Sequence, residues 1–111
     1  MSIKKMELSM LCDIYGSLLS DKQREAVELY CNEDYSLSEI AENTGISRQG
    51  VRDQIKHAEN QLVTFEESLG LLIKTTKLNE KLAKLLEMQE IKTNDKLSGI
   101  IGDIQDIFNF D

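Results

Sequence analysis

The sequence predicts an all-α protein, and three observations support that prediction. The 111 residues contain no proline and only six glycines, so uninterrupted helices are permitted along most of the chain. Aromatic residues make up 5%, and aliphatic helix formers dominate the apolar positions. Apolar residues recur at steps of three and four, and no segment shows the alternation of a half-buried strand. We expect a helix-turn-helix domain in residues 1–70 and a helical C-terminal extension in residues 71–111.

The first two helices are predicted at about residues 5–19 and 21–32. The apolar face of the first consists of Met6, Met10, Ile14 and Leu18. The second begins at a capping box, in which Ser20 and Gln23 each satisfy a free backbone N–H of the other. Its expected inward residues are Val27, Tyr30 and Cys31.

A helix-turn-helix is predicted next in the chain. A second capping box, Ser36 with Glu39, opens a short helix that ends near Asn43. Gly45 follows where a helix end usually turns left-handed, and Ser47 caps the next helix. The residues expected to clamp the two helices are Ile40, Ile46, Val51 and Ile55, with the small Ala41 at the crossing. This spacing predicts a tri-helical unit resembling the DNA-binding helix-turn-helix.

The second helix of this motif is predicted to be long. Its apolar stripe comprises Val51, Ile55, Ala58, Leu62, Phe65, Leu69 and Leu72, at alternating steps of four and three. Gly70 is the expected break, because glycine costs about 1 kcal/mol inside a helix. The second half of the stripe, Leu62, Phe65, Leu69 and Leu72, is the expected interface of a homodimer.

Two C-terminal helices complete the prediction. One covers about residues 71–88, with the apolar residues Leu71, Leu78, Leu82 and Leu85 and with lysines on its other side. The last begins after Asn94 and carries the stripe Leu97, Ile100, Ile101, Ile104, Ile107 and Phe108. Gly99 and Gly102 either permit close helix contact there or mark the helix as weak.

The candidate nucleic-acid-binding residues lie on the second helix of the motif, away from the apolar clamp. They are Ser47, Arg48, Gln49, Arg52 and Lys56. Arginine and glutamine suit bidentate contacts with guanine and adenine edges. Asp53 and Glu59 are expected to be solvated helix charges. Residues 36–62 hold three basic and four acidic side chains and the whole chain has a net charge of -7, so strong unassisted duplex binding is not expected.

Several functional classes are not supported by the sequence. No catalytic residues, phosphate loop or cofactor turn are recognisable, so we expect a non-enzymatic protein without cofactors. His57 is the only histidine and is expected on a helix surface, not in a metal site. Cys12 and Cys31 match no zinc or redox spacing and are expected to be buried free thiols in a reducing cytoplasm. No signal peptide or membrane span of about 18 apolar residues is present.

Two resemblances arise at these residues. The run from Leu19 to Glu25, with Leu29, residues 38–41 and residues 45–47, resembles region 4 of sigma-70-type factors. More closely, residues 6–75 resemble the YlxM family of small bacterial helix-turn-helix proteins. The residues that carry this resemblance are 15–24, 28–30, 34–37, 39–41, 47–49, 51, 53, 55–56 and 59. The chain departs from the family pattern at Gly50, Arg52 and His57, where alanine, tyrosine and arginine are expected.

The YlxM resemblance implies a cytoplasmic, all-helical accessory factor of the signal recognition particle. Members are typically encoded beside the gene for the particle's GTPase, so the RNA, the GTPase and the receptor are the implied partners. The helix-turn-helix of the family implies contact with RNA or DNA. Two alternatives remain open at this stage: a dimeric DNA-binding transcription regulator, and an adaptor that binds only protein.

Overall fold

The computed structural model describes residues 3–108, and every regular element in them is helical. The elements are α1 (Lys5–Tyr15), the 3₁₀ turn η1 (Gly16–Leu18), α2 (Asp21–Cys31), α3 (Leu37–Thr44), α4 (Arg48–Leu69), α5 (Leu71–Glu87), α6 (Gln89–Lys92) and α7 (Asp95–Ile107). This confirms the all-α prediction. The chain forms two compact units, Met1–Gly70 and Leu71–Asp111, called here the N-terminal unit and the C-terminal unit.

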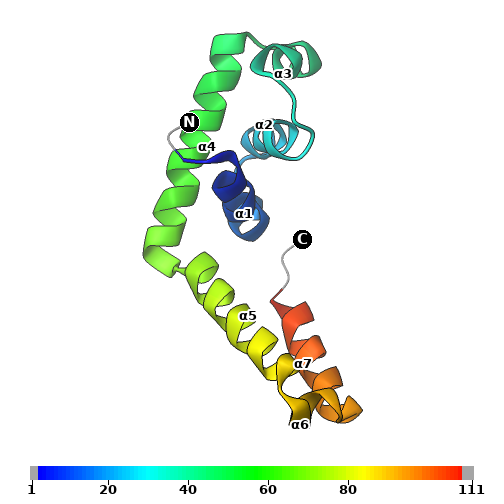
Figure 1. The fold of residues 1–111 in the computed structure, drawn as a ribbon. Helices are drawn as coiled ribbons and strands as arrows, with labels where there is room; N and C mark the ends of the chain where they lie inside the picture. The colour runs from blue at the N-terminus through cyan, green and yellow to red at the C-terminus, as the bar shows by residue number, and fades with distance from the viewer. Residues whose placement is uncertain (1–2, 109–111) are drawn as a thin grey trace. The chain divides into compact units, whose positions relative to one another are not determined.

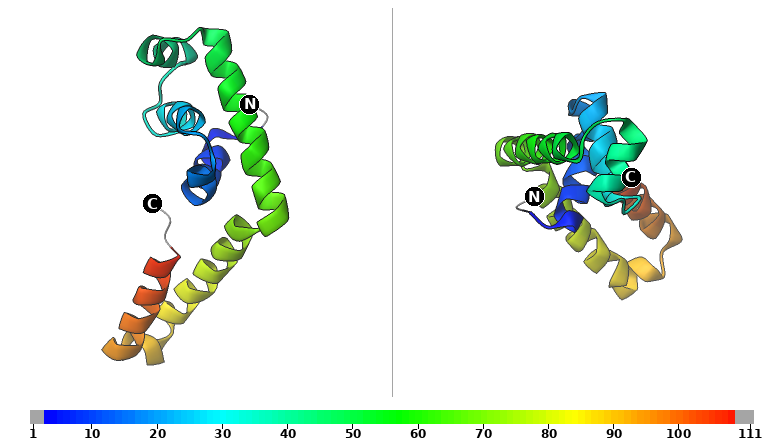
Figure 2. Two further views of the ribbon diagram at one scale, coloured as in Figure 1. Left: turned by 180° about the vertical axis from the view of Figure 1, so that it is seen from behind. Right: turned by 90° about the horizontal axis from the view of Figure 1, so that it is seen from above.

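In the N-terminal unit, α1, α2 and α3 all pack on one side of the long helix α4 (Figures 1 and 2). The core between them is aliphatic, with one tyrosine. Its fully buried side chains are Leu8, Leu11, Tyr15, Ala26, Val27, Ile40, Val51, Ile55, Ala58 and Leu62. Burial of a leucine or isoleucine side chain stabilises a fold by roughly 1.5–3 kcal/mol, so this one cluster accounts for the stability of a unit of this size.

The predicted apolar face of α1 was wrong. Met6 and Leu18 are 74% and 57% exposed, whereas Leu8, Leu11 and Tyr15 are 1% exposed. The face of α1 that packs against α2 and α4 carries Leu8, Leu11, Cys12 and Tyr15 instead, so the predicted set lies largely outside the core. The helix also ends at Tyr15, because Gly16 and Ser17 are poor helix formers and continue as the 3₁₀ turn η1.

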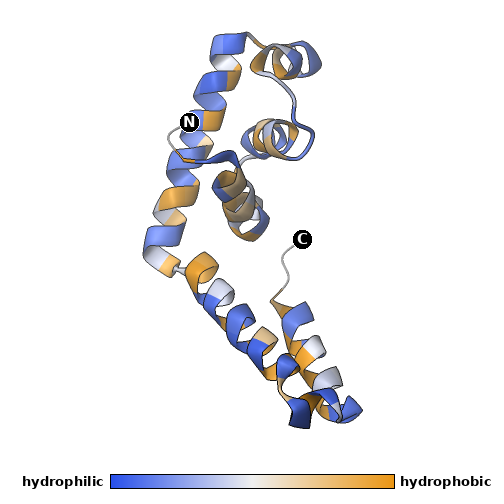
Figure 3. Ribbon diagram, in the orientation of Figure 1, coloured by the Kyte–Doolittle hydropathy of each residue, from blue (hydrophilic) through white to orange (hydrophobic). Residues whose placement is uncertain are grey.

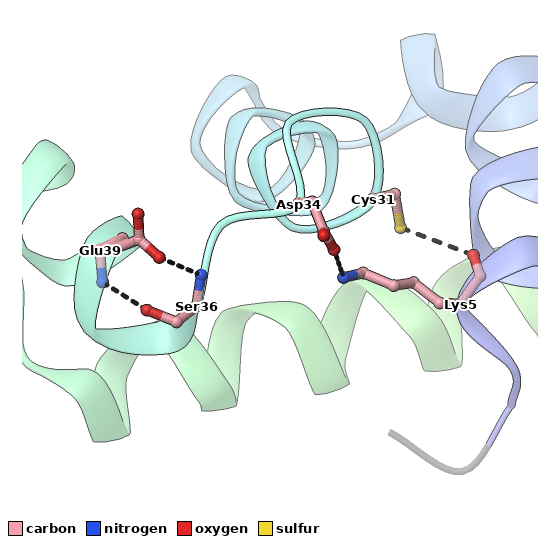
Figure 4. A network of polar contacts seen from close by, with 5 residues as sticks. All are labelled: Lys5, Cys31, Asp34, Ser36 and Glu39. Atoms are coloured by element: carbon pink, nitrogen blue, oxygen red, sulfur yellow. Dashed lines mark hydrogen bonds and ion pairs between the residues drawn. The ribbon is translucent and has the colours of Figure 1, made fainter.

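Both predicted capping boxes are confirmed. Ser20 Oγ accepts from the backbone N–H of Gln23 at 3.2 Å, and the Gln23 side chain accepts from the Ser20 N–H at 3.2 Å. Ser36 and Glu39 make the same reciprocal pair, each at 3.1 Å (Figure 4). These boxes fix where α2 and α3 begin, and therefore how the motif is presented on α4.

Gly45 closes α3 in the left-handed conformation, with φ 78° and its N–H on the Ala41 carbonyl. A Cβ at this position would meet no atom within 4 Å, so the cost of a side chain is conformational and not steric. We expect Gly45→Ala to lower the free energy of unfolding by about 1–2 kcal/mol. Gly45→Asn is the control and should cost less, since asparagine tolerates this conformation. Urea unfolding of both variants checks this; equal losses would contradict the conformational explanation.

The stripe on α4 is buried only over its first four turns. Val51, Ile55, Ala58 and Leu62 are fully covered by α1, α2 and α3, whereas Leu69 is 48% exposed. Leu62 therefore belongs to the core of a single chain, and its assignment to a dimer interface was wrong. Phe65 is half-buried, with its ring centroid 5.9 Å from that of Tyr15. Leu72 is half-buried and lies in α5, because Gly70 ends α4 with φ 63°.

Glu59 is buried, which the sequence analysis did not expect. The residue is 1% exposed, and a side-chain oxygen accepts from the backbone N–H of Ile3 at 2.7 Å. It lies four residues after Ile55 and three before Leu62, so it shares their inward face. About two turns further on, Glu66 accepts from the Tyr15 hydroxyl at 2.7 Å. Two carboxylates of α4 thus bind the N-terminal segment and α1.

Lys5 connects the start of α1 to the turn between α2 and α3. Its Nζ lies 2.6 Å from Asp34 Oδ1 (Figure 4). The same Nζ lies 4.4 Å from the centre of the Tyr30 ring. Beside this pair, the Cys31 thiol donates to the Lys5 carbonyl at 3.7 Å. Burial raises the pKa of both Cys12 and Cys31 to about 11, and both thiols are free. Cys12 is buried as expected, but Cys31 and Tyr30 are only half-buried.

The Lys5–Asp34 pair makes the free energy of unfolding depend on pH in the acidic range. The hydrogen bond from Lys5 lowers the pKa of Asp34 below its ordinary 3.8, so the pair stabilises the fold above that value and is lost as pH falls through the lower, folded-state pKa. We expect Asp34→Asn to reduce stability at pH 7 and to make a progressively smaller difference as pH falls below 3.8. Asparagine tolerates the φ of 55° at this position. Glu33→Gln, which removes the same charge from the same turn, should show no such pH-dependent difference in urea unfolding.

The C-terminal unit is a helical hairpin in which α5 and α7 pack together and the short α6 joins them (Figure 1). The buried residues among its described positions are Thr75, Leu82 and Ile101. The sequence analysis did not predict α6, which is a single turn. Asn94 caps α7 by accepting from the Leu97 N–H at 3.1 Å. A Cβ at Gly99 or Gly102 would meet nothing within 4 Å, so these glycines do not serve close helix contact.

Candidate nucleic-acid interface

The candidate interface begins at the first turn of α4, immediately after the turn of the motif. Ser47 has the extended backbone of an N-cap, and its Oγ accepts from the Gly50 N–H at 3.0 Å. A Cβ at Gly50 would lie 3.1 Å from that oxygen, so glycine leaves room for the cap. The hydroxyl hydrogen of Ser47 remains able to donate to a phosphate. The free N–H groups and positive dipole end of α4 favour an anion at the same place.

Arg48, Arg52 and Lys56 extend from this end along the outer face of α4. All three are exposed, and they follow one another at intervals of one helical turn. Within residues 3–108, no carboxylate lies within 4.0 Å of any of their charged groups. Val51 and Ile55, on the adjacent face of α4, are held in the core. The packing of the motif therefore presents three free cations in one row.

Gln49 is less free than its neighbours. Its Nε2 donates to Asp53 Oδ1 at 2.9 Å, one turn further along α4. Bidentate contact with adenine would require this hydrogen bond to break or to be shared. Asp53 also brings a negative charge onto the face that carries Arg52 and Lys56. Gln49 can therefore contact a base only when its hydrogen bond to Asp53 breaks or is shared, whereas the three cations need no such change.

One residue that the sequence analysis did not select also borders this face, and a second lies beside the turn on another side of the motif. Leu37, at the first position of α3, lines a shallow hollow together with Arg48, Gln49 and Arg52. An apolar side chain there suits the methyl group of thymine. Lys22, at the start of α2, lines a second hollow beside Ile46 at the turn. The capping-box position of Lys22 gave no functional signal; only the fold brings it beside the turn.

Ile46 does not act as the buried clamp that was expected. It is 37% exposed, whereas Ile40, Val51 and Ile55 are fully buried. The residue stands between the end of α3 at Gly45 and the cap of α4 at Ser47, so neither helix holds it on its apolar stripe. Ala41 is half-buried at the helix pair. The clamp therefore consists of three residues, and Ile46 lies on the surface beside Lys22.

The described residues contain no cluster placed to hold a metal ion and no helix suited to cross a membrane. His57 is exposed on α4, as expected. Between residues 3 and 108, no three His, Cys, Asp or Glu side chains are placed to hold a metal ion. In the same range, no helix combines the length and apolarity that crossing a membrane requires.

The sequence of this chain is similar to those of known proteins. A family model described as "Putative helix-turn-helix protein, YlxM / p13 like", named UPF0122, matches residues 2–101. A UPF0122 protein of Caldanaerobacter subterraneus is 50% identical over 80 residues, which cover 72% of this chain and 68% of the relative. Relatives of the same family name from Acetivibrio thermocellus and Clostridium kluyveri are 47% identical over 92 residues and 38% identical over 102 residues. These matches cover 83% and 92% of this chain, and 77% and 92% of the respective relatives.

Proposed function

We propose, from the premise that this chain belongs to the UPF0122 family of YlxM-like helix-turn-helix proteins, that the first half of α4 contacts a nucleic-acid duplex. The observation that carries the proposal is the row of exposed cations without carboxylate partners, Arg48, Arg52 and Lys56, that begins at the helix N-terminus. The protein acts by binding and not by catalysis.

Duplex DNA is the favoured ligand. The major groove of B-DNA admits an α-helix, and arginine side chains there read guanine edges. The major groove of an RNA helix is too deep and narrow for side chains to read. The N-terminal unit carries seven basic and thirteen acidic side chains, so its affinity comes from a few contacts and not from a broad basic surface. We therefore expect weak non-specific binding and stronger binding to a preferred sequence.

An accessory role in the signal recognition particle is the second candidate. Its support is the resemblance described above together with the net charge of -7, which suits a basic protein or ribonucleoprotein partner in the cytoplasm. In this role, the particle's RNA, its GTPase or its receptor is the ligand. An adaptor that binds only protein retains the same fold without using the row of cations.

A homodimer would place two copies of α4 about 34 Å apart, as two-fold regulators do on DNA. Because Leu62 lies in the core of one chain, such a dimer cannot use it. The half-buried Phe65 and the exposed Leu69 are the remaining candidates on that helix. Sedimentation of the intact protein measures whether the dimer forms.

The deciding experiment titrates labelled random-sequence duplex DNA and labelled signal recognition particle RNA with the protein, at 50 and 150 mM salt. Preference for DNA with a steep salt dependence supports the first proposal. Tight RNA binding with weak DNA binding supports the particle instead. Absence of binding to both probes at the lower salt overturns the nucleic-acid proposal and leaves a protein partner.

A further inference from the structure

The C-terminal unit contains a row of lysines on α5. Lys74, Lys77, Lys81 and Lys84 follow at steps of three, four and three residues, so they share one helix face. Lys77, Lys81 and Lys84 are all exposed. Within the described part of the chain, no carboxylate lies within 4.0 Å of these three ammonium groups. Hydrophilic residues, blue in Figure 3, recur along α5 beside the apolar residues that face α7.

This row differs in charge from the rest of the protein. Helix α5 carries four lysines and two glutamates, Glu80 and Glu87, in a chain whose net charge is -7. Keeping like charges together on one face costs repulsion, which an anionic ligand would remove. Lys84 lies in the last turn, where it also stabilises the helix end. Lys77 and Lys81 lie in the helix interior, and the helix end does not account for them.

We propose that the lysine face of α5 binds the phosphate backbone of duplex DNA. From Lys77 to Lys84 the row extends over about 10 Å, which corresponds to about three phosphates of one strand at about 3.4 Å per phosphate along the axis. Lysine ammonium groups bind phosphate as point charges and read no sequence, so α5 adds affinity while α4 supplies base contacts. This inference rests on the proposed function and supplies phosphate contacts that the acidic N-terminal unit lacks.

The test compares two double variants with the same change in charge. Lys77→Gln with Lys81→Gln removes two cations from the row, while Lys92→Gln with Lys96→Gln removes two from α6 and α7. Glutamine preserves helix propensity, and circular dichroism checks that each variant is folded. Affinity for a random-sequence duplex is measured between 50 and 200 mM salt. We expect the first variant to reduce the slope of log K against log salt by about 2 and the control to leave it unchanged.

The outcomes separate this inference from the proposed function. Equal slopes for the first variant and the wild type, with binding still lost on removing Arg48, Arg52 and Lys56, overturn the lysine face alone. Equal reductions in both double variants show a net-charge effect and also overturn it. A change in sedimentation mass without a change in slope means that the face binds an acidic protein surface instead. Failure of the wild-type protein to bind the duplex at 50 mM salt overturns both proposals.

Discussion

Leu62→Glu is expected to unfold the N-terminal unit at ambient temperature or to lower its melting temperature by at least about 15 °C. The side chain is fully covered by the helices that pack on α4. A carboxylate there loses its hydration without gaining a partner, at a cost of about 3–5 kcal/mol. In a unit of this size each kcal/mol shifts the melting temperature by roughly 4–8 °C. Thermal unfolding followed by far-ultraviolet circular dichroism measures the effect.

Leu69→Glu is the matched control on the same helix. Leu69 is 48% exposed, so a charge there keeps its water, and stability should change by about 0.5 kcal/mol or less. A Leu62→Glu protein that keeps its melting temperature but halves its sedimentation mass would contradict the intramolecular core. A Leu69→Glu protein that changes only in mass would identify Leu69 as an oligomer contact.

Replacement of Arg48, Arg52 and Lys56 by alanine is expected to weaken duplex binding by at least about 100-fold at 50 mM salt. Each bidentate base contact contributes about 1–3 kcal/mol, and each phosphate contact contributes about 0.9 to the salt slope. All three side chains are exposed and face away from the core, so the fold should persist. Fluorescence anisotropy with a labelled duplex measures the loss, and circular dichroism verifies the fold.

A triple variant at Lys4, Lys92 and Lys96 removes the same charge from elsewhere in the chain. We expect it to bind the duplex within about threefold of the wild-type protein, because none of these three lysines belongs to the row of cations on α4. Equal weakening by both triple variants would show that net charge alone governs binding. Unchanged binding after removal of the α4 cations would exclude this face as the contact.

The parts of the fold that the sequence predicted well are those set by local chemistry. The two capping boxes, the left-handed Gly45 and the end of α4 at Gly70 depend on residues within one turn of one another. Helix faces were harder to predict, because they depend on which neighbours cover them. The face of α1 was assigned to Met6 and Met10, and only packing against α2 and α4 selects Leu8 and Leu11 instead.

The candidate interface divides in the same way. Exposure of Arg48, Arg52 and Lys56 followed from their positions off the apolar stripe of Val51 and Ile55 on one helix. Leu37 could not be selected, because the packing of α3 brings it to the site from another part of the sequence. Glu59 was expected on the surface because glutamate is charged. Its position four residues after Ile55, however, places it on the buried face of α4. Its burial satisfies the Ile3 N–H, a contact between residues 56 positions apart.

The central claim is that the first half of α4 lies on nucleic acid. An NMR titration of ¹⁵N-labelled protein with a random-sequence DNA duplex at 50 mM salt tests it most directly. The account predicts that the amide shifts that move most within the N-terminal unit belong to residues 47–56 and their neighbour Leu37. Shifts in that unit confined to the exposed face of α1, or no shifts at all, would contradict it.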